Sequence, residues 1–420
     1  MRSALLSGCL LAVAVTALAS GGCTRTATSR PGSGNAASQP TAHAAPTPAA
    51  ATAPFGLALM RSLGAGNLVL SPDSIAAALA MAGSGAAGQT ASQMAGVLHL
   101  SSPLAFAAVG QLQGAIAAEQ QAAAHGDPQA ATLELANGLF IQQGHSLKPP
   151  FLAGLRAHFG AAPQTVDFEQ ASAVEAINAW VNGHTQGIIP SILTGLPKQT
   201  LLALANAIYL KAAWRYPFKP AATATAPFRG RRGNVPIAFM HESEALPYGH
   251  GRGYAAVEEP YRSSTLSLLV MLPVGQSLAA LERGLTAARL GAIVHGLSTR
   301  PVRLSLPRFH LATHATLNGA LQALGMTDAF SNADFSAIAD GELKLGVVAH
   351  AADFKVDEAG TVAAAATVVT IEPTAAHALG PRPVAFDADR PFLFFLRDDR
   401  SGAVLFAGRL SDAGSARLPA

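Results

Sequence analysis

The sequence predicts a mixed α+β domain with largely antiparallel sheets. Of its 420 residues, 50% are hydrophobic and only 13% are charged, so a large core can be buried. Helical patterns lie mainly in the first part of the chain and strand patterns mainly in the later part. Such segregated runs, without strict alternation of strand and helix, are typical of the α+β class.

The N-terminal segment predicts export. Arg2 is followed by an apolar stretch, residues 4–19, which has signal-peptide length but is too short for a stable membrane span. Residues 17–19 (ALA) fit ordinary signal peptidase, whereas residues 20–23 (SGGC) resemble a bacterial lipoprotein box. A similar match at residues 6–9 has too little apolar sequence before it. We therefore expect a lipid on Cys23 and a cell-envelope location, with free secretion as the alternative.

Four segments follow from these observations and from composition. Residues 1–23 are the expected signal peptide, and residues 24–53 are rich in Ala, Thr, Ser and Pro, as disordered tethers are. Residues 54–411 form one predicted globular domain, and residues 412–420 form a tail. Both cysteines lie in the leader, so an exported domain would depend on its core and not on disulfides.

Within the domain, each element has a local signal. Ser71 and Asp73 precede an Ala-rich segment at 75–81, and residues of these types favour helix starts. Helical patterns recur at 176–181 and at 317–324, where leucines share one face. The expected strands are apolar runs, or in the last case an alternating one: residues 201–210, 266–272, 391–396, 403–406 and 302–306.

Several functional classes lack support. The net charge is +3, and no Lys or Arg lies between Arg61 and Lys148, so we expect no nucleic-acid binding. Residues 83–88 (GSGAAG) follow a helical segment instead of a strand, which favours a loop between helices over a dinucleotide site. His241 and Glu242 lack the second histidine of a zinc-protease helix. No nucleophile elbow or P-loop is present, so we expect neither an enzyme nor a metal or cofactor.

One segment near the C-terminus combines two kinds of pattern. Residues 356–373 read VDEAGTVAAAATVVTIEP, and the part from Thr361 to Ile371 has no charge, proline or glycine. Small and β-branched residues of this kind predict a strand that can be buried on both faces. Yet acidic residues and Gly360 precede it, and a Pro/Gly-rich stretch follows at 375–383, as in a loop.

Motifs in the C-terminal part resemble those of the serpin family. Residues 386–396 (FDADRPFLFFL) resemble the family signature, and residues 358–367 (EAGTVAAAAT) resemble the hinge of its reactive-centre loop. The resemblance covers about residues 54–411 and implies three mainly antiparallel sheets, about nine α-helices and an exposed reactive-centre loop. Further similar segments lie at residues 67–75, 177–189, 206–218, 258–261, 271–273, 306–309, 324–326 and 333–335.

The resemblance implies a suicide inhibitor of serine proteases. The protease cleaves the loop and remains attached as an acyl adduct while residues 361–372 insert into the main sheet, a use of strand addition known for serpins. It implies a protease as partner, a monomer and no cofactor. Contact with a membrane is expected only through the lipid anchor at Cys23. The hinge residues implied are Glu358, Gly360, Thr361, Ala363, Ala364, Ala365 and Ala366, and the gating or structural residues are Ser71, Ser74, Asn206, Trp214 and His350.

The position of the cleaved bond is predicted only to within a few residues. Counting from Gly360 gives Thr374–Ala375, and a long second half of the loop leaves Ala376 and His377 open. Small residues favour an elastase-like or subtilisin-like target, since no Lys or Arg lies between Lys355 and Arg382. A non-inhibitory serpin, acting as a carrier or chaperone, is the alternative. The alanines of the hinge favour inhibition, because bulky, charged or proline residues there would block insertion.

Overall fold

The described residues form two sheets and nine α-helices. The structure, a computed structural model, describes residues 48–127, 130–197, 199–361 and 382–416. They belong to the second of two compact units, Ala45–Ala420. The helices are α1 Pro48–Ser62, α2 Pro72–Gly83, α3 Gly88–Val97, α4 Phe106–Ala124, α5 Pro149–Phe159, α6 Ser172–His184, α7 Leu278–Gly284, α8 Ala287–His295 and α9 Asn318–Ala323.

The strands pair mainly in antiparallel fashion. One sheet has six strands in the order β10-β11-β12-β4-β2-β3, and the other has nine, β1-β15-β14-β8-β7-β6-β9-β13 with β5 on β6. The strands are β1 Leu68–Leu70, β2 Thr132–Gln142, β3 Gln164–Val166, β4 Leu202–Ala213, β5 Ala224–Gly230, β6 Gly233–Gly251, β7 Tyr254–Pro260, β8 Leu266–Pro273, β9 Ser298–Pro307, β10 Phe309–Thr316, β11 Leu345–Val356, β12 Gly360–Thr361, β13 Val384–Asp387, β14 Phe392–Asp398 and β15 Val404–Leu410.

The α+β prediction is therefore confirmed, including its antiparallel character. Three pairs are parallel among the described strands: β11 with β4, β2 with β3, and β13 with β9. The long strand β6 pairs first with β5, over residues 233–239, then with β9, over residues 239–248, and finally with β7, over residues 248–251. It thereby joins two of the three expected sheets into one continuous ladder.

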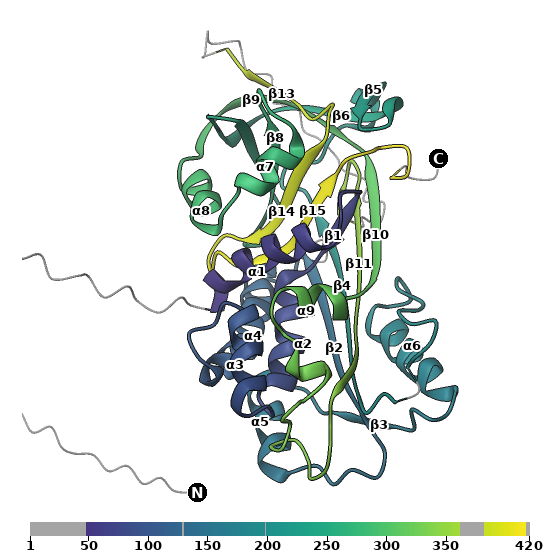
Figure 1. Cartoon of the computed structure of the whole chain (residues 1–420). Coiled ribbons are helices and arrows are strands. Elements are labelled where there is room, and N and C mark those ends of the chain that lie inside the picture. The colour runs from purple at the N-terminus through teal and green to yellow at the C-terminus, as the bar shows by residue number, and fades with distance from the viewer. Residues whose placement is uncertain (1–47, 128–129, 198, 362–381, 417–420) are drawn as a thin grey trace, which may run out of the picture. The chain divides into compact units, whose positions relative to one another are not determined.

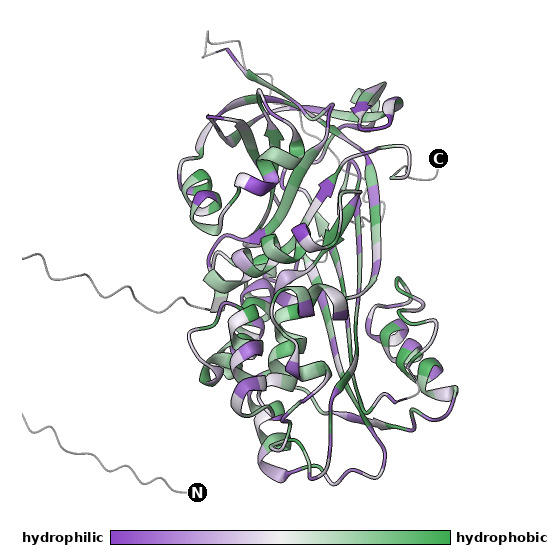
Figure 2. Cartoon of the chain, viewed as in Figure 1, coloured by the Kyte–Doolittle hydropathy of each residue, from purple (hydrophilic) through white to green (hydrophobic). Residues whose placement is uncertain are grey.

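Helices cover both faces of the six-stranded sheet. Figure 1 shows α2, α4 and α5 on one side and α6 on the other. The period-two alternation of β4 separates its residues accordingly, because Leu202 and Leu204 join the core beneath α2, whereas Ala203, Ala205 and Ala207 join the core beneath α6. In the nine-stranded sheet, apolar residues run along β14, which is buried throughout (Figure 2).

Most local predictions are confirmed. Ser71 caps α2, its Oγ accepting a hydrogen bond from the Ser74 amide at 3.1 Å. The GSGAAG segment connects α2 to α3 and follows no strand. The strand runs correspond to β4, β8, β14 and β15, and the alternating run at 302–306 lies in β9. The chain around His241 and Glu242 is the strand β6, not a helix.

Both domain boundaries extend beyond those expected. Helix α1 begins at Pro48, inside the predicted tether, because proline is favoured in the first helical turn and alanine throughout it. The Thr52 hydroxyl accepts a hydrogen bond from the Val404 amide at 2.9 Å, which fixes this turn to β15. At the other end, the predicted tail is packed as far as Ala416, whose carbonyl accepts from His310 N–H at 2.9 Å.

Candidate functional site

The described part of the hinge is a short strand inserted between β11 and β4. Thr361 of β12 lies opposite Val356 of β11 and opposite Ala212 of β4, antiparallel to both. Just before it, the Ala359 carbonyl accepts from Trp214 N–H at 3.0 Å. Farther along, β11 and β4 pair directly and in parallel. Two parallel neighbours can each pair with one antiparallel strand placed between them, so the hinge occupies the entrance to such a position.

Gly360 is required by the closeness of the β4 backbone. A Cβ atom at this position would lie 1.9 Å from the Ala212 carbonyl oxygen and 2.8 Å from the Ala213 Cα. Both contacts are with backbone, so no side-chain rotation relieves them. Only glycine can lie this close to β4 without displacing one of the two strands.

Thr361 is held by a buried aromatic pair. Its Oγ1 lies 2.5 Å from the Tyr261 hydroxyl, and both side chains are fully buried. The Tyr261 ring stacks on Trp214 with centroids 4.5 Å apart. Trp214 Nε1 donates to the Asp357 carbonyl at 2.9 Å. Trp214 therefore contacts the chain on both sides of the hinge turn, once directly and once through Tyr261.

The acidic residues before β12 fix the turn. The Glu358 carboxylate accepts from the Thr223 hydroxyl at 2.7 Å and lies 3.5 Å from Arg308 Nε. The Asp357 carboxylate accepts from the Ala359 amide at 3.0 Å and pairs with Lys355 at 3.2 Å. The charges that look unsuited to a core strand are largely buried and paired, and they anchor the beginning of β12.

A second group of polar residues, the Asn206 cluster, lies between α2 and the six-stranded sheet. Asn137, Asn206 and His350 are neighbours across β2, β4 and β11. The Asn206 amide donates to Ser74 Oγ at 2.5 Å and to Asn137 Oδ1, and its oxygen accepts from His350 Nδ1 at 2.6 Å. Ser71 N–H donates to His350 Nε2 at 3.3 Å. The cluster ties the first turn of α2 to the three strands.

His350 is neutral in this arrangement. Because Nε2 accepts from a backbone amide, the ring proton resides on Nδ1. Complete burial lowers the pKa of His350 to about 3, and the nearby His314 acts in the same direction. A neutral ring with both nitrogens engaged has no proton-transfer partner, so its geometry is that of a structural hydrogen-bonding group.

The cluster continues along a path that sequence reasoning missed. Asn137 Nδ2 donates to Gln113 Oε1 at 3.1 Å, and Gln113 Nε2 donates to the Asp73 carboxylate at 3.0 Å. Burial raises the pKa of Asp73 to about 6. Tyr261 was missed as well, because residues 258–261 (EEPY) were recognised only as a segment similar to the serpin family and not as a contact of the hinge. Nothing in the Ala/Gln-rich sequence of α4 distinguishes Gln113 from its neighbours.

The structure thus brings Glu358, Gly360, Thr361 and Trp214 together, and Ser71, Ser74, Asn206 and His350 form a separate group. The other predicted site residues, Ala363, Ala364, Ala365, Ala366, Thr374, Ala375, Ala376, His377 and Cys23, lie outside the described residues. The described part of the chain contains no group of acidic, histidine or cysteine side chains arranged to hold a metal. None of its helices is long and apolar enough to cross a membrane.

Comparisons with known proteins cover nearly the whole described domain. The family model "Serpin (serine protease inhibitor)" matches residues 50–413. The chain is 35% identical over 347 residues to a serpin-like protein of Thermococcus kodakarensis, covering 82% of this chain and 80% of that protein. It is 34% identical to the human leukocyte elastase inhibitor, covering 84% and 95%.

Solved structures agree with these sequence comparisons. The native-state structure of tengpin, a thermophilic serpin, superposes with a TM-score of 0.75 at 27% identity and covers 86% of this chain and 93% of that one. The position of β12 between β11 and β4, here called the hinge seat, and the match along residues 50–413 lead to the same conclusion. The chain is a member of the serpin family of protease inhibitors.

Proposed function

We propose that the protein is a suicide inhibitor that traps serine proteases by inserting its cleaved loop into the six-stranded sheet. The observation that carries this proposal is β12, which lies between β11 and β4 and pairs with both. Addition of further residues to β12 would continue an existing strand instead of nucleating a new one. About ten additional strand hydrogen bonds, at about 1 kcal/mol net each, would contribute on the order of 10 kcal/mol.

The register of β12 supports the length of the inserting segment. Counting onward from Thr361, which is opposite Ala212, brings residue 371 opposite Leu202, the first residue of β4. The same count along β11 brings residue 372 opposite Leu345, its first residue. Continued along β4, it brings Thr374 level with Gln199. Insertion of residues 361–372 would thus fill the sheet from end to end.

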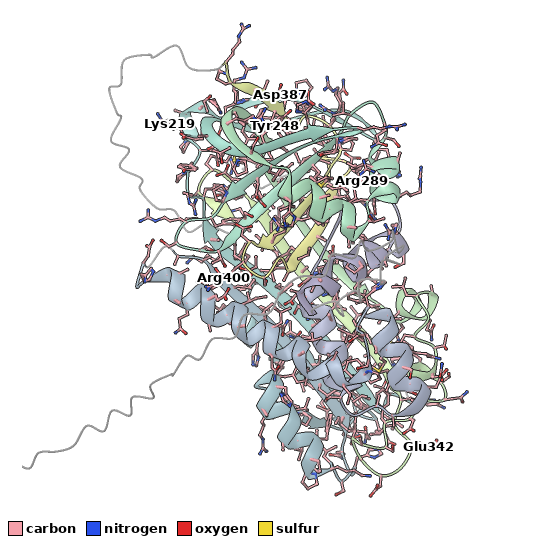
Figure 3. All side chains as sticks on the ribbon, turned by 90° about the vertical axis from the view of Figure 1, so that its left-hand side faces the viewer. Lys219, Tyr248, Arg289, Glu342, Asp387 and Arg400 are labelled. Atoms are coloured by element: carbon pink, nitrogen blue, oxygen red, sulfur yellow. The ribbon has the colours of Figure 1, made fainter. Side chains whose placement is uncertain are left out.

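A cavity at the distal end would receive the cleaved end of the loop. Gln199, Leu201 and Leu343 line this cavity of about 620 Å³, together with Glu342. Figure 3 shows Glu342 at one end of the domain and Lys219, which follows Phe218 beside the hinge, at the other. The register therefore supports Thr374–Ala375 as the cleaved bond, because Thr374 would arrive where the sheet ends.

Small residues around Thr374 support a protease with a small specificity pocket, elastase-like or subtilisin-like. The relatives named leukocyte elastase inhibitor, from human and pig, are consistent with this class.

Incubation with elastase-like, subtilisin-like and trypsin-like proteases, followed by denaturing gels and mass analysis, tests the proposal. We expect a denaturant-stable adduct with one of the first two and a released peptide beginning at Ala375. Cleavage without adduct and without a gain in thermal stability would favour a non-inhibitory carrier or chaperone.

We also propose that the chain is exported and lipid-anchored through Cys23. A Cys23→Ser variant is expected to move from the membrane fraction to the soluble fraction, because it lacks the cysteine to which the lipid anchor is attached. Cell fractionation with detection of the serpin domain measures this, and Cys9→Ser serves as the matched control. Equal membrane retention of both variants and the wild type contradicts lipidation at Cys23.

A further inference from the structure

Two glutamates without hydrogen-bond donors lie next to the hinge seat. Glu242 of β6 and Glu259 of β7 are opposite Leu304 and Leu268, respectively, so their strand partners are apolar. Glu259 is 1% exposed. All four carboxyl oxygens are buried, and none has a donor within the described residues. The two carboxyl groups do lie within hydrogen-bonding reach of each other.

This geometry requires a proton between the two groups. Two buried carboxylates repel each other and accept hydrogen bonds from nothing, whereas a carboxyl group can donate to a carboxylate. Burial raises the pKa of Glu242 to about 7, and burial together with the charge of Glu242 raises the pKa of Glu259 well above its usual range. Glu244 of β6 adds to both effects, while Arg215 opposes the shift of Glu259.

The pair is connected to the hinge through the end of β7. Glu259 is followed by Pro260, whose carbonyl accepts from Arg215 N–H at 2.9 Å. Next comes Tyr261, which forms a β-bridge with Trp214 and holds the Thr361 hydroxyl. Burial raises the pKa of Tyr261, so this hydroxyl is neutral and adds no charge. Movement of the Glu259 backbone therefore moves the residue that retains Thr361.

We propose that Glu242 and Glu259 form a proton-dependent latch that holds the hinge in its seat. With the shared proton present, β6 and β7 pack closely and Tyr261 stays against Trp214 and Thr361. Loss of that proton leaves two facing carboxylates, whose repulsion is relieved when the end of β7 moves toward solvent. Tyr261 then withdraws, and β12 loses its side-chain anchor.

The direction of the pH dependence follows from proton linkage. In the closed hinge the pair retains a proton at pH values where solvated glutamates, with pKa near 4.5, have lost theirs. The pKa of Glu242 is about 7 and that of Glu259 is also well above 4.5, so opening releases at least one proton as the pH rises from about 5 to 7 and becomes at least tenfold more favourable for each pH unit there. The latch is strongest in acid and loosens as the pH rises.

Hydrogen exchange of the intact, protease-free protein tests the latch. Exchange of the peptide containing Ala359–Thr361 is measured at pH 5.5, 6.5 and 7.5 and corrected for intrinsic rates with an unfolded peptide of the same sequence. We expect wild-type opening to increase at least tenfold between pH 5.5 and pH 6.5 and to be greatest at pH 7.5. Glu259→Gln should lower that slope, because position 259 then has no proton to release and its amide can donate to Glu242. Glu244→Gln, an exposed neighbour with the same charge change, should retain it.

A second readout keeps the test decisive if Glu259→Gln folds poorly. Glu242→Gln should have the same effect on exchange, and fluorescence of Trp214 in a Trp180→Phe background reports directly on the stacking of Tyr261, since the chain has two tryptophans. A corrected exchange rate that is constant with pH in the wild type overturns the proposal. So does an unchanged slope in both glutamine variants. Since no protease is present, these outcomes are independent of inhibition.

Discussion

A Gly360→Val variant is expected to be cut by the protease that the wild type traps, with at least a tenfold lower yield of adduct. The Cβ atom would overlap the Ala212 carbonyl oxygen at 1.9 Å, so β12 cannot occupy its position beside β4. The acyl intermediate would then be hydrolysed, and the protease released, before insertion begins. Each 1.4 kcal/mol added to the insertion barrier shifts this competition about tenfold.

Densitometry of denaturing gels, with the ratio of adduct to cleaved serpin, measures the effect. Gly195→Val is the matched control, since a Cβ atom at Gly195 meets nothing within 4 Å. If Gly360→Val traps the protease as efficiently as the control does, the contact of the hinge with β4 has no role in inhibition.

An Asn206→Ala variant is expected to lose about 2–4 kcal/mol of stability. The substitution leaves His350 Nδ1 buried without a partner, which costs about 1–3 kcal/mol, and it removes the hydrogen bond to Ser74 Oγ, which keeps Asn137 Oδ1 as a partner at 3.1 Å. Since the same cluster ties α2 to β2, β4 and β11, the sheet is expected to open more readily.

Urea unfolding followed by far-UV circular dichroism checks the loss, with native gels to detect self-association. Asn332→Ala, at an exposed position, should leave both measurements unchanged. Equal stability of the two variants would show that the hydrogen bonds of Asn206 are exchanged for water without net loss.

Local patterns in the sequence predict much of the fold and part of the site. Ser71 and Asp73 identify the start of α2 because capping depends only on adjacent residues. The sequence identifies Gly360 only as a loop-like residue of the hinge, whereas the structure shows why glycine is needed there: the backbone of β4 lies against it. That reason depends on which strand lies beside the hinge, and no local pattern contains this information.

The residues that were missed share one property: they act through contacts between distant segments. Tyr261 meets Thr361 across 100 positions of sequence, and Asn137 meets Asn206 across 69. Glu242 and Glu259 are unremarkable in sequence, where only the absent second histidine drew attention to Glu242. Their burial, and the lack of donors around them, depend on the apolar strands beside them: β9, which is distant in sequence from Glu242, and β8, which is adjacent to β7 only through a turn.

The alanine face beneath α6 determines where the six-stranded sheet is easiest to part. Ala203, Ala205 and Ala207 of β4 and Ala349 and Ala351 of β11 present only methyl groups to that helix. A methyl group forms few dispersion contacts, so lifting α6 away and separating these strands disrupts little packing. Resistance to opening therefore comes from the backbone hydrogen bonds between β11 and β4, the Asn206 cluster, the hinge and the packing on the α2 side, and little of it from the α6 side. An inserting strand can replace the β11–β4 hydrogen bonds with its own, so the alanine face adds little to the free-energy cost of insertion.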